Sequence, residues 1–222
     1  MPVTINGSNT PTAGGITYGD GTNYASTAAG TSGQVLTSAG SSAPTWTTPS
    51  AGALTLLANI TPTAATTVQS LSVFTSTYDN YLIIASGISC ATTGQYLLMR
   101  YAVAGVVDTA ANYGAQGFYP SNNNSINQTN ADVFCGAGTV TASSGGASFV
   151  MSITNANATN GTYKVTDIKG VLTGVSTSVF QGFTGPGMYK GTSAISGFQF
   201  YWNAGANFAA QGNVRVYGYA NS

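Results

Sequence analysis

The strongest structural signal in this 222-residue chain is Tyr81-Leu82-Ile83-Ile84-Ala85-Ser86-Gly87-Ile88-Ser89. Side chains alternate between the two faces of a strand, and Leu82, Ile83 and Ile84 make both faces apolar. Such a strand is typical of the centre of a sheet that is covered on each side. The preceding residues, Thr77-Tyr78-Asp79-Asn80, favour a turn, because Asp and Asn side chains bond to their own backbone.

Further apolar runs of strand length lie on both sides of this segment, and clusters of Gly, Asn and Thr separate them. No amphipathic segment of helical period is longer than about two turns. The other predicted strands are residues 54–60, 67–74, 95–103, 148–154, 163–172, 178–183, 195–202 and 213–219. About nine strands at this spacing predict an all-β domain over residues 51–222, built as an antiparallel β-sandwich with a jelly roll as the favoured topology.

Residues 105–137 break the strand pattern with aromatic and Asn-rich stretches, and they predict a loop-rich insertion. A long irregular excursion in a compact domain is usually functional or disordered. Two short motifs, Gly136-Ala137-Gly138 and Gly185-Pro186-Gly187, lack the third Gly and the following helix of a phosphate-binding loop. We expect both motifs to be turns.

Residues 1–50 differ from the rest of the chain, because Gly, Thr, Ser, Asn and Ala dominate them. Burial of the apolar anchors Val35, Leu36 and Trp46 contributes about 1.5 to 3 kcal/mol each. Ordering the segment costs about 1 to 2 kcal/mol of backbone entropy per residue. We therefore expect an extended, irregular N-terminal segment that is disordered, packed on the following domain, or wound with copies of itself and a partner.

A short repeat in virion proteins of tailed bacteriophages is similar to Gly33-Gln34-Val35-Leu36-Thr37-Ser38, followed by Gly40 and Ala43-Pro44-Thr45-Trp46. This resemblance implies a connector in fibres, their stems or their attachment collars. The β-sandwich domains of phage fibre and head-decoration proteins resemble the run from Phe74 to Tyr101 and the ending Gly212-Asn213-Val214-Arg215-Val216-Tyr217-Gly218. Both resemblances imply a place in a virion that is assembled in the host cytoplasm.

Charged residues make up only 5% of the chain against a usual quarter, Glu and His are absent, and the formal net charge is zero. Without a strong field of either sign, neither nucleic acid nor an anionic membrane is a favoured partner. Net charge near zero promotes association, which suits a member of a multi-copy assembly. Residues 1–7 lack a basic region and an apolar run, so we expect no secretory signal.

The sequence predicts no catalytic residues, no metal site and no cofactor. Without His or Glu, the candidates for a general base are five scattered Asp residues. Cys90 and Cys135 lack the His partner that a cysteine nucleophile or a zinc site needs. The two thiols could pair, but a reducing cytoplasm favours small buried thiols. We therefore expect a protein that is not an enzyme.

A saccharide site remains open, because sugar binding needs aromatic platforms beside neutral hydrogen-bonding side chains. Within residues 105–137, these groups are supplied by Tyr113, Phe118, Tyr119 and Asn122. The competing interpretation is a loop that covers the edge of the sandwich.

The favoured hypothesis is a non-enzymatic structural protein of a tailed-phage virion, namely a homotrimeric tail fibre or spike subunit. Its N-terminal segment attaches to other virion proteins through Val35, Leu36 and Trp46, and its β-sandwich projects. One alternative is a head decoration or cement protein. A second alternative is a receptor-recognition tip that binds a host surface glycan.

Overall fold

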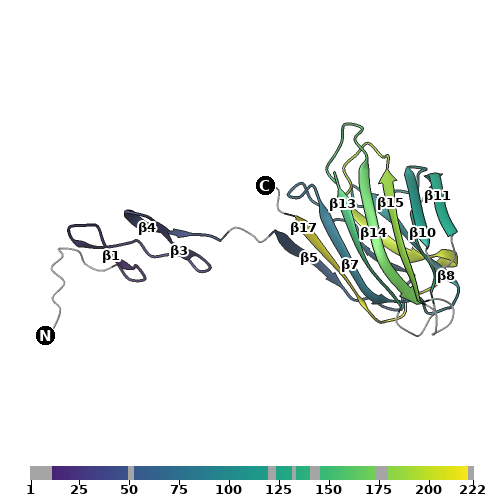
Figure 1. Cartoon of the computed structure of the whole chain (residues 1–222), viewed down its shortest axis with the longest axis horizontal. Helices are drawn as coiled ribbons and strands as arrows, with labels where there is room; N and C mark the ends of the chain where they lie inside the picture. Colours follow the sequence, from purple (N-terminus) through teal and green to yellow (C-terminus); the bar gives the residue numbers. More distant parts are fainter. Residues whose placement is uncertain are drawn as a thin grey trace. The chain divides into compact units, whose positions relative to one another are not determined.

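Figure 1 shows a computed structural model of the chain, in which residues 12–49, 53–119, 124–131, 134–140, 146–173 and 180–219 are described. In these residues every regular element is a strand, apart from the 3-10 turn η1 (Asn203–Gly205). None of the described residues forms a helix with the length and apolarity that a membrane span requires. The prediction of an all-β fold is confirmed. The chain divides into two compact units, Met1–Ala51 and Gly52–Ser222.

The unit Gly52–Ser222 contains an eight-stranded and a five-stranded sheet, and all neighbouring strands are antiparallel. The order of the first sheet is β11 (Asn124–Ala131), β10 (Tyr113–Tyr119), β15 (Phe180–Tyr189), β14 (Lys164–Thr173), β13 (Ala147–Thr154), β7 (Tyr81–Ile88), β17 (Asn213–Tyr219) and β5 (Leu54–Ile60). The second sheet has the order β12 (Phe134–Val140), β8 (Gln95–Val103), β16 (Gly197–Trp202) and β6 (Thr67–Ser70), with β9 (Val106–Val107) beside β8.

Eight of these strands have the strand order of a jelly roll. Taken along the chain, they are β5, β6, β7, β8, β12, β13, β16 and β17. The first pairs with the last, the second with the seventh, the third with the sixth and the fourth with the fifth. The remaining long strands, β10, β11, β14 and β15, extend the first sheet beyond β13, as the row of strands in Figure 1 shows.

The core lies between the two sheets, because alternate residues of each strand point inward. Phe198, Phe200 and Trp202 of β16 are at most 1% exposed, as their shared face in the sequence predicts. Phe200 meets Phe149 of β13 edge-on, with ring centroids 5.6 Å apart. Aromatic contacts of this kind join the two sheets.

The strand β7 is central in its sheet, but the prediction that both its faces are covered is wrong for the described residues. Its inward residues, such as Ile83, are fully buried, whereas Leu82 and Ile84 on the outer face are only half-buried. Val150, which pairs with Ile84 from β13, is 45% exposed, and Leu56 of β5 is 52% exposed. The outer face of this sheet is therefore exposed in the single chain, and there these apolar side chains lie beside polar and charged ones such as Arg215 and Lys169.

The described residues between 105 and 137 do not form the predicted loop-rich insertion. They contain β9, β10 and β11 and the start of β12, and both glycine motifs predicted as turns lie within strands. Pro186 of β15 pairs with Asp167 of β14 on one side. On the other side, β10 pairs with Gly187 and Thr184 of β15 but not with Pro186. Pro lacks the N–H that a second ladder would require. The local turn preference is overridden because neighbouring strands supply the hydrogen bonds.

The unit Met1–Ala51 is not irregular over its described residues, 12–49, which corrects the expectation from its composition. It contains two hairpins, β1 (Thr17–Gly19) with β2 (Tyr24–Ser26), and β3 (Val35–Ala39) with β4 (Ser42–Thr47). In the first turn, the Asp20 carboxylate accepts hydrogen bonds from the backbone N–H groups of Thr22 and Asn23. These bonds replace hydrophobic burial as the source of local order.

Candidate functional site

Trp46, in the second hairpin of the N-terminal unit, contacts the residues that directly follow the first hairpin. Its indole N–H lies 2.9 Å from the carbonyl oxygen of Ala28 and 3.3 Å from the hydroxyl of Thr27. Its ring lies against Gly30, where an added β-carbon would be only 2.6 Å from a ring atom. Trp46 was predicted as an attachment residue, and within the single chain it already has this internal packing role.

Val35 and Leu36 lie on opposite faces of the second hairpin, because successive strand residues alternate. Leu36 pairs with Trp46 across the hairpin, whereas Val35 pairs with Thr47. Both apolar side chains remain exposed, Leu36 by 41% and Val35 by 50%. The structure therefore brings Leu36 and Trp46 together and leaves Val35 on the other side.

The predicted glycan-contact residues have different outcomes. Tyr113 is fully buried, its hydroxyl donates to the backbone oxygen of Asp108 at 2.9 Å, and it accepts from the N–H of Tyr101 at 3.0 Å. A ring without exposed surface cannot act as a sugar platform, so the prediction is wrong for Tyr113. Phe118 and Tyr119 belong to β10 and remain a prediction, and Asn122 lies outside the described residues.

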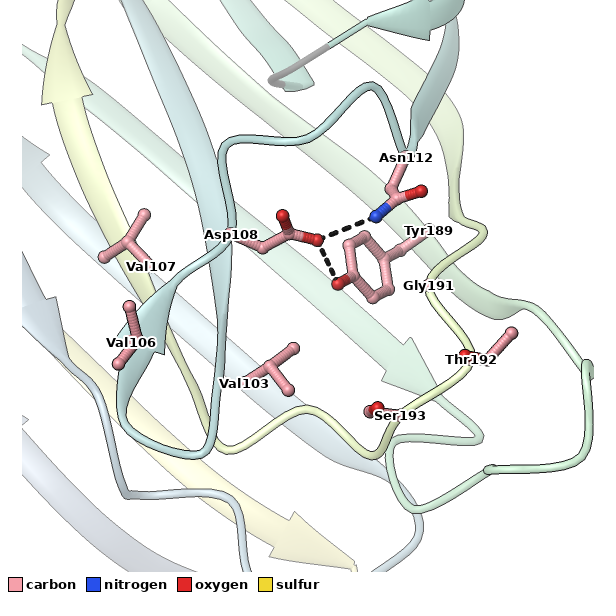
Figure 2. Close-up of a pocket in the computed structure, with 9 residues that line it drawn as sticks. All are labelled: Val103, Val106, Val107, Asp108, Asn112, Tyr189, Gly191, Thr192 and Ser193. Atoms are coloured by element: carbon pink, nitrogen blue, oxygen red, sulfur yellow. Dashed lines mark hydrogen bonds between the residues drawn. The ribbon is translucent and has the colours of Figure 1, made fainter.

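A pocket of about 380 Å³ opens beside Asp108 (Figure 2). It forms where the segment that joins β8 to β10 meets the segment that follows β15. Its lining combines an apolar wall with a carboxylate, an amide and three hydroxyls. The lining residues are Val103, Val106, Val107, Asp108, Asn112, Tyr189, Gly191, Thr192 and Ser193.

Asp108 is held in this pocket by three hydrogen bonds. The side-chain amide of Asn112 donates to its carboxylate at 2.9 Å, the N–H of Ala110 donates at 2.8 Å, and the Tyr189 hydroxyl also donates to it. Burial by itself would raise the pKa of the Asp108 carboxyl. The bonds from Tyr189, Asn112 and Ala110 outweigh burial and hold that pKa below its ordinary value. Asp108 is thus an anion at neutral pH.

A buried polar cluster lies behind the pocket. The ring of Tyr189 stands 5.1 Å from that of Tyr113 and 5.5 Å from that of Tyr101, measured between centroids. The fully buried Lys164 places its ammonium nitrogen 2.7 Å from the carbonyl oxygen of Gly191 and 5.8 Å from the centroid of the Tyr189 ring. Burial lowers the pKa of Lys164 and raises the pKa values of the three tyrosines.

A second hollow, of about 520 Å³, lies between the turn before β7 and the loop after β13. Amides and hydroxyls dominate its described lining, in which Asp79 supplies the one carboxylate. The amide of Asn157 donates to the backbone oxygen of Tyr78 at 2.8 Å and to the Asp79 carboxylate at 3.1 Å. These bonds use the donors of Asn157 to hold the two loops together.

Metal and thiol chemistry has little support in the described residues. They contain no group of three or more His, Cys, Asp or Glu side chains that could hold a metal ion. Cys90 is a free, buried thiol that lies 3.5 Å from the hydroxyl of Thr92 and 3.5 Å from the backbone oxygen of Asn207. Cys90 therefore forms no disulfide in this structure.

Sequence reasoning missed the pocket beside Asp108. The only local signal was that Asp108 and Asn112 lie four residues apart, and this spacing occurs in many loops. Thr192 and Ser193, which also line the pocket, come about 80 residues later in the chain. Only the sheet topology brings this segment to Asp108 and Asn112. Searches of protein-family models, curated proteins and solved structures found no match to this chain.

Proposed function

We propose that this chain is a non-enzymatic structural protein of a tailed-phage virion, as a subunit of a homotrimeric tail fibre or spike. The N-terminal hairpins attach it to other virion proteins, and the jelly roll is the projecting part. The proposal begins from the two sequence resemblances, the connector motif around Val35 to Trp46 and the β-sandwich motifs.

The observation that carries the proposal is the second hairpin of the N-terminal unit. Leu36 and Val35 expose apolar surface on both of its faces, although Trp46 has a packing site within the unit. Exposed apolar surface on two sides of a thin hairpin is stabilised when other chains cover both sides. Copies of the same hairpin around a symmetry axis, together with a virion partner, provide such cover.

Exposed apolar side chains on the outer face of the eight-stranded sheet also favour assembly. Leu56 and Val150 are about half-exposed there, and the formal net charge of zero provides little repulsion between copies. A surface of this kind favours a protein that works beside other copies of itself.

The experiment that tests the proposal measures mass and location. Light scattering of the purified chain should give three times the mass of one 22.4 kDa chain. Antibody labelling of intact virions, viewed by negative-stain microscopy, should mark the tail. Label on the head would favour a decoration protein instead, and a monomer that is absent from virions would refute both assignments.

A further inference from the structure

The pocket beside Asp108 has unused hydrogen-bonding capacity. An ionised carboxylate offers about four acceptor sites, and three donors reach Asp108. The amide of Asn112 donates one N–H to Asp108, and no described residue donates to its side-chain oxygen. The exposed hydroxyls of Thr192 and Ser193 make no hydrogen bond within the described part of the chain. The pocket thus presents both donors and acceptors.

The mixture of donors and acceptors discriminates between classes of ligand. An anion is repelled by the Asp108 carboxylate, which its hydrogen bonds keep ionised. An ammonium group only donates, so it gives no acceptor to the hydroxyl protons of Thr192 and Ser193. A purely apolar ligand would desolvate Asp108 without giving it a partner. A hydroxyl group both donates and accepts, and therefore matches every polar group in the lining.

The apolar wall adds a second requirement. Val103, Val106 and Val107 line the pocket on the side of β9, and Val106 is 70% exposed. A ligand that fits has hydroxyls on one edge and C–H groups on another, as a sugar ring has. The volume of about 380 Å³ is at the small end of ligand sites, which suits a single ring.

We propose that this pocket binds one neutral sugar residue of a saccharide. One hydroxyl of the sugar donates to Asp108 and a neighbouring hydroxyl bonds the amide of Asn112, while the hydroxyl of Ser193 bonds the opposite edge of the ring. The valine wall packs on the C–H face of the ring. Tyr189 is 1% exposed and contributes through its hydrogen bond to Asp108, not as a stacking platform.

This inference does not depend on the assembly role proposed above, because a monomer that never enters a virion would still carry the pocket. It also places sugar contact on residues other than the aromatic side chains that the sequence suggested. A failure of the sugar site would leave the mass and location experiment unaffected.

Binding is tested by titrating the isotope-labelled full chain with methyl glycosides of glucose, galactose, mannose, rhamnose and N-acetylglucosamine, followed by NMR. At about 20 mM glycoside, a site with a Kd in the millimolar range is well populated. We expect at least one glycoside to shift the backbone amide signals of Val106 to Asn112 and Gly191 to Ser193. Methylammonium chloride, as the cationic probe, should leave these signals unchanged.

The variants Ser193→Ala and Asn112→Ala should each weaken the binding of that glycoside at least fivefold. Ser193→Ala removes a hydroxyl that has no described partner, so it tests the contact even if Asn112→Ala disturbs the fold. Ser72→Ala, a change at an exposed site away from the pocket, is the matched control and should bind as the wild type does. The proposal is wrong if no glycoside shifts these signals, if the shifts map to the hollow beside Asp79, or if methylammonium competes for the site.

Discussion

The hydroxyl of Tyr101 in β8 and the hydroxyl of Thr166 in β14 are hydrogen-bonded to each other at the centre of the sandwich. Tyr101 is fully buried, Thr166 is 3% exposed, and the two strands belong to different sheets. This polar contact joins the two sheets inside the core, as does the hydrogen bond from the N–H of Tyr101 to the hydroxyl of Tyr113 in β10. Buried contacts of this kind specify one packing arrangement, because leaving either hydroxyl without its partner is costly.

The first prediction concerns this contact. Replacing Thr166 with Val, or Tyr101 with Phe, should lower the free energy of unfolding by about 1 to 3 kcal/mol, because each change removes the partner of a buried hydroxyl. The double variant should lose less than the sum, because the second change removes the hydroxyl that the first left behind. Urea unfolding of the four proteins measures this coupling, and strictly additive losses would contradict it.

The second prediction concerns the contact between Gly30 and Trp46. Replacing Gly30 with Ala should displace the indole ring, because the new β-carbon would lie 2.6 Å from it. The indole N–H of Trp46 should then lose the bond to Ala28 and exchange faster with solvent. The chain contains two Trp residues, so NMR shows two indole N–H signals and only one should change. Gly19→Ala is the control, because an added β-carbon there meets no atom within 4 Å. Unchanged exchange in Gly30→Ala would disprove the packing role.

The strands of the jelly roll were the part of the fold that the sequence predicted well. Residues 54–60, 95–103 and 213–219 form β5, β8 and β17 with the expected bounds, because alternation or continuous apolarity marks a strand with a buried face. Strands β10 and β11 were not predicted, because glycine and polar residues interrupt their apolar pattern. They form by pairing, β11 with β10 and β10 with β15. Pairing partners far away in sequence leave no local pattern.

The sites were predictable to a smaller extent. The exposure of Val35 and Leu36 followed from the lack of apolar neighbours in their segment. The packing of Trp46 could not be predicted, because its ring lies on Gly30 and its N–H bonds the carbonyl oxygen of Ala28. Neither partner has a recognisable sequence pattern. The burial of Tyr113 was missed for a related reason, since an aromatic residue in a polar stretch resembles a surface platform until its strand is placed.

The third prediction concerns alkaline pH. Burial holds the pKa values of Tyr101, Tyr113 and Tyr189 above the ordinary 10.0 in the folded protein. The unfolded chain loses these protons once the pH passes about 10, while the folded chain keeps them. The stability that the three groups contribute is therefore fully present below pH 10 and declines as the pH rises further.

Urea unfolding at a series of pH values between about 9 and 11 gives the free energy of unfolding at each pH. The slope of this free energy with pH reports the number of protons released on unfolding. Tyr101→Phe should make the slope shallower by up to one proton, because one buried phenol is gone. Tyr24→Phe, which changes a side chain that is 53% exposed, is the control and should keep the wild-type slope. A slope that Tyr101→Phe leaves unchanged would show that this phenol is not the one being titrated.

The fourth prediction concerns the N-terminal unit and rests on the proposed function. Deleting Met1 to Ser50 should leave a folded jelly roll, because Gly52–Ser222 is a compact unit with its own core. Its thermal melting should hardly move, whereas its incorporation into virions should be lost. Calorimetry of the purified domain and immunoblotting of purified virions measure the two effects. Equal incorporation of the deleted and complete chains would place the attachment surface in the jelly roll.

Point variants then separate attachment from the internal packing of the hairpins. Leu36→Ser and Val35→Ser change side chains that are 41% and 50% exposed, so the Trp46 indole N–H should exchange as slowly as in the wild type while incorporation falls. Trp46→Ala should reduce incorporation by a different route, because it removes the ring that joins the two hairpins. Thr45→Ser, a small change at an exposed position of the same hairpin, should be neutral. If Trp46→Ala alone reduces incorporation, the partner recognises the overall shape of the unit, and the apolar side chains of Val35 and Leu36 are not its contacts.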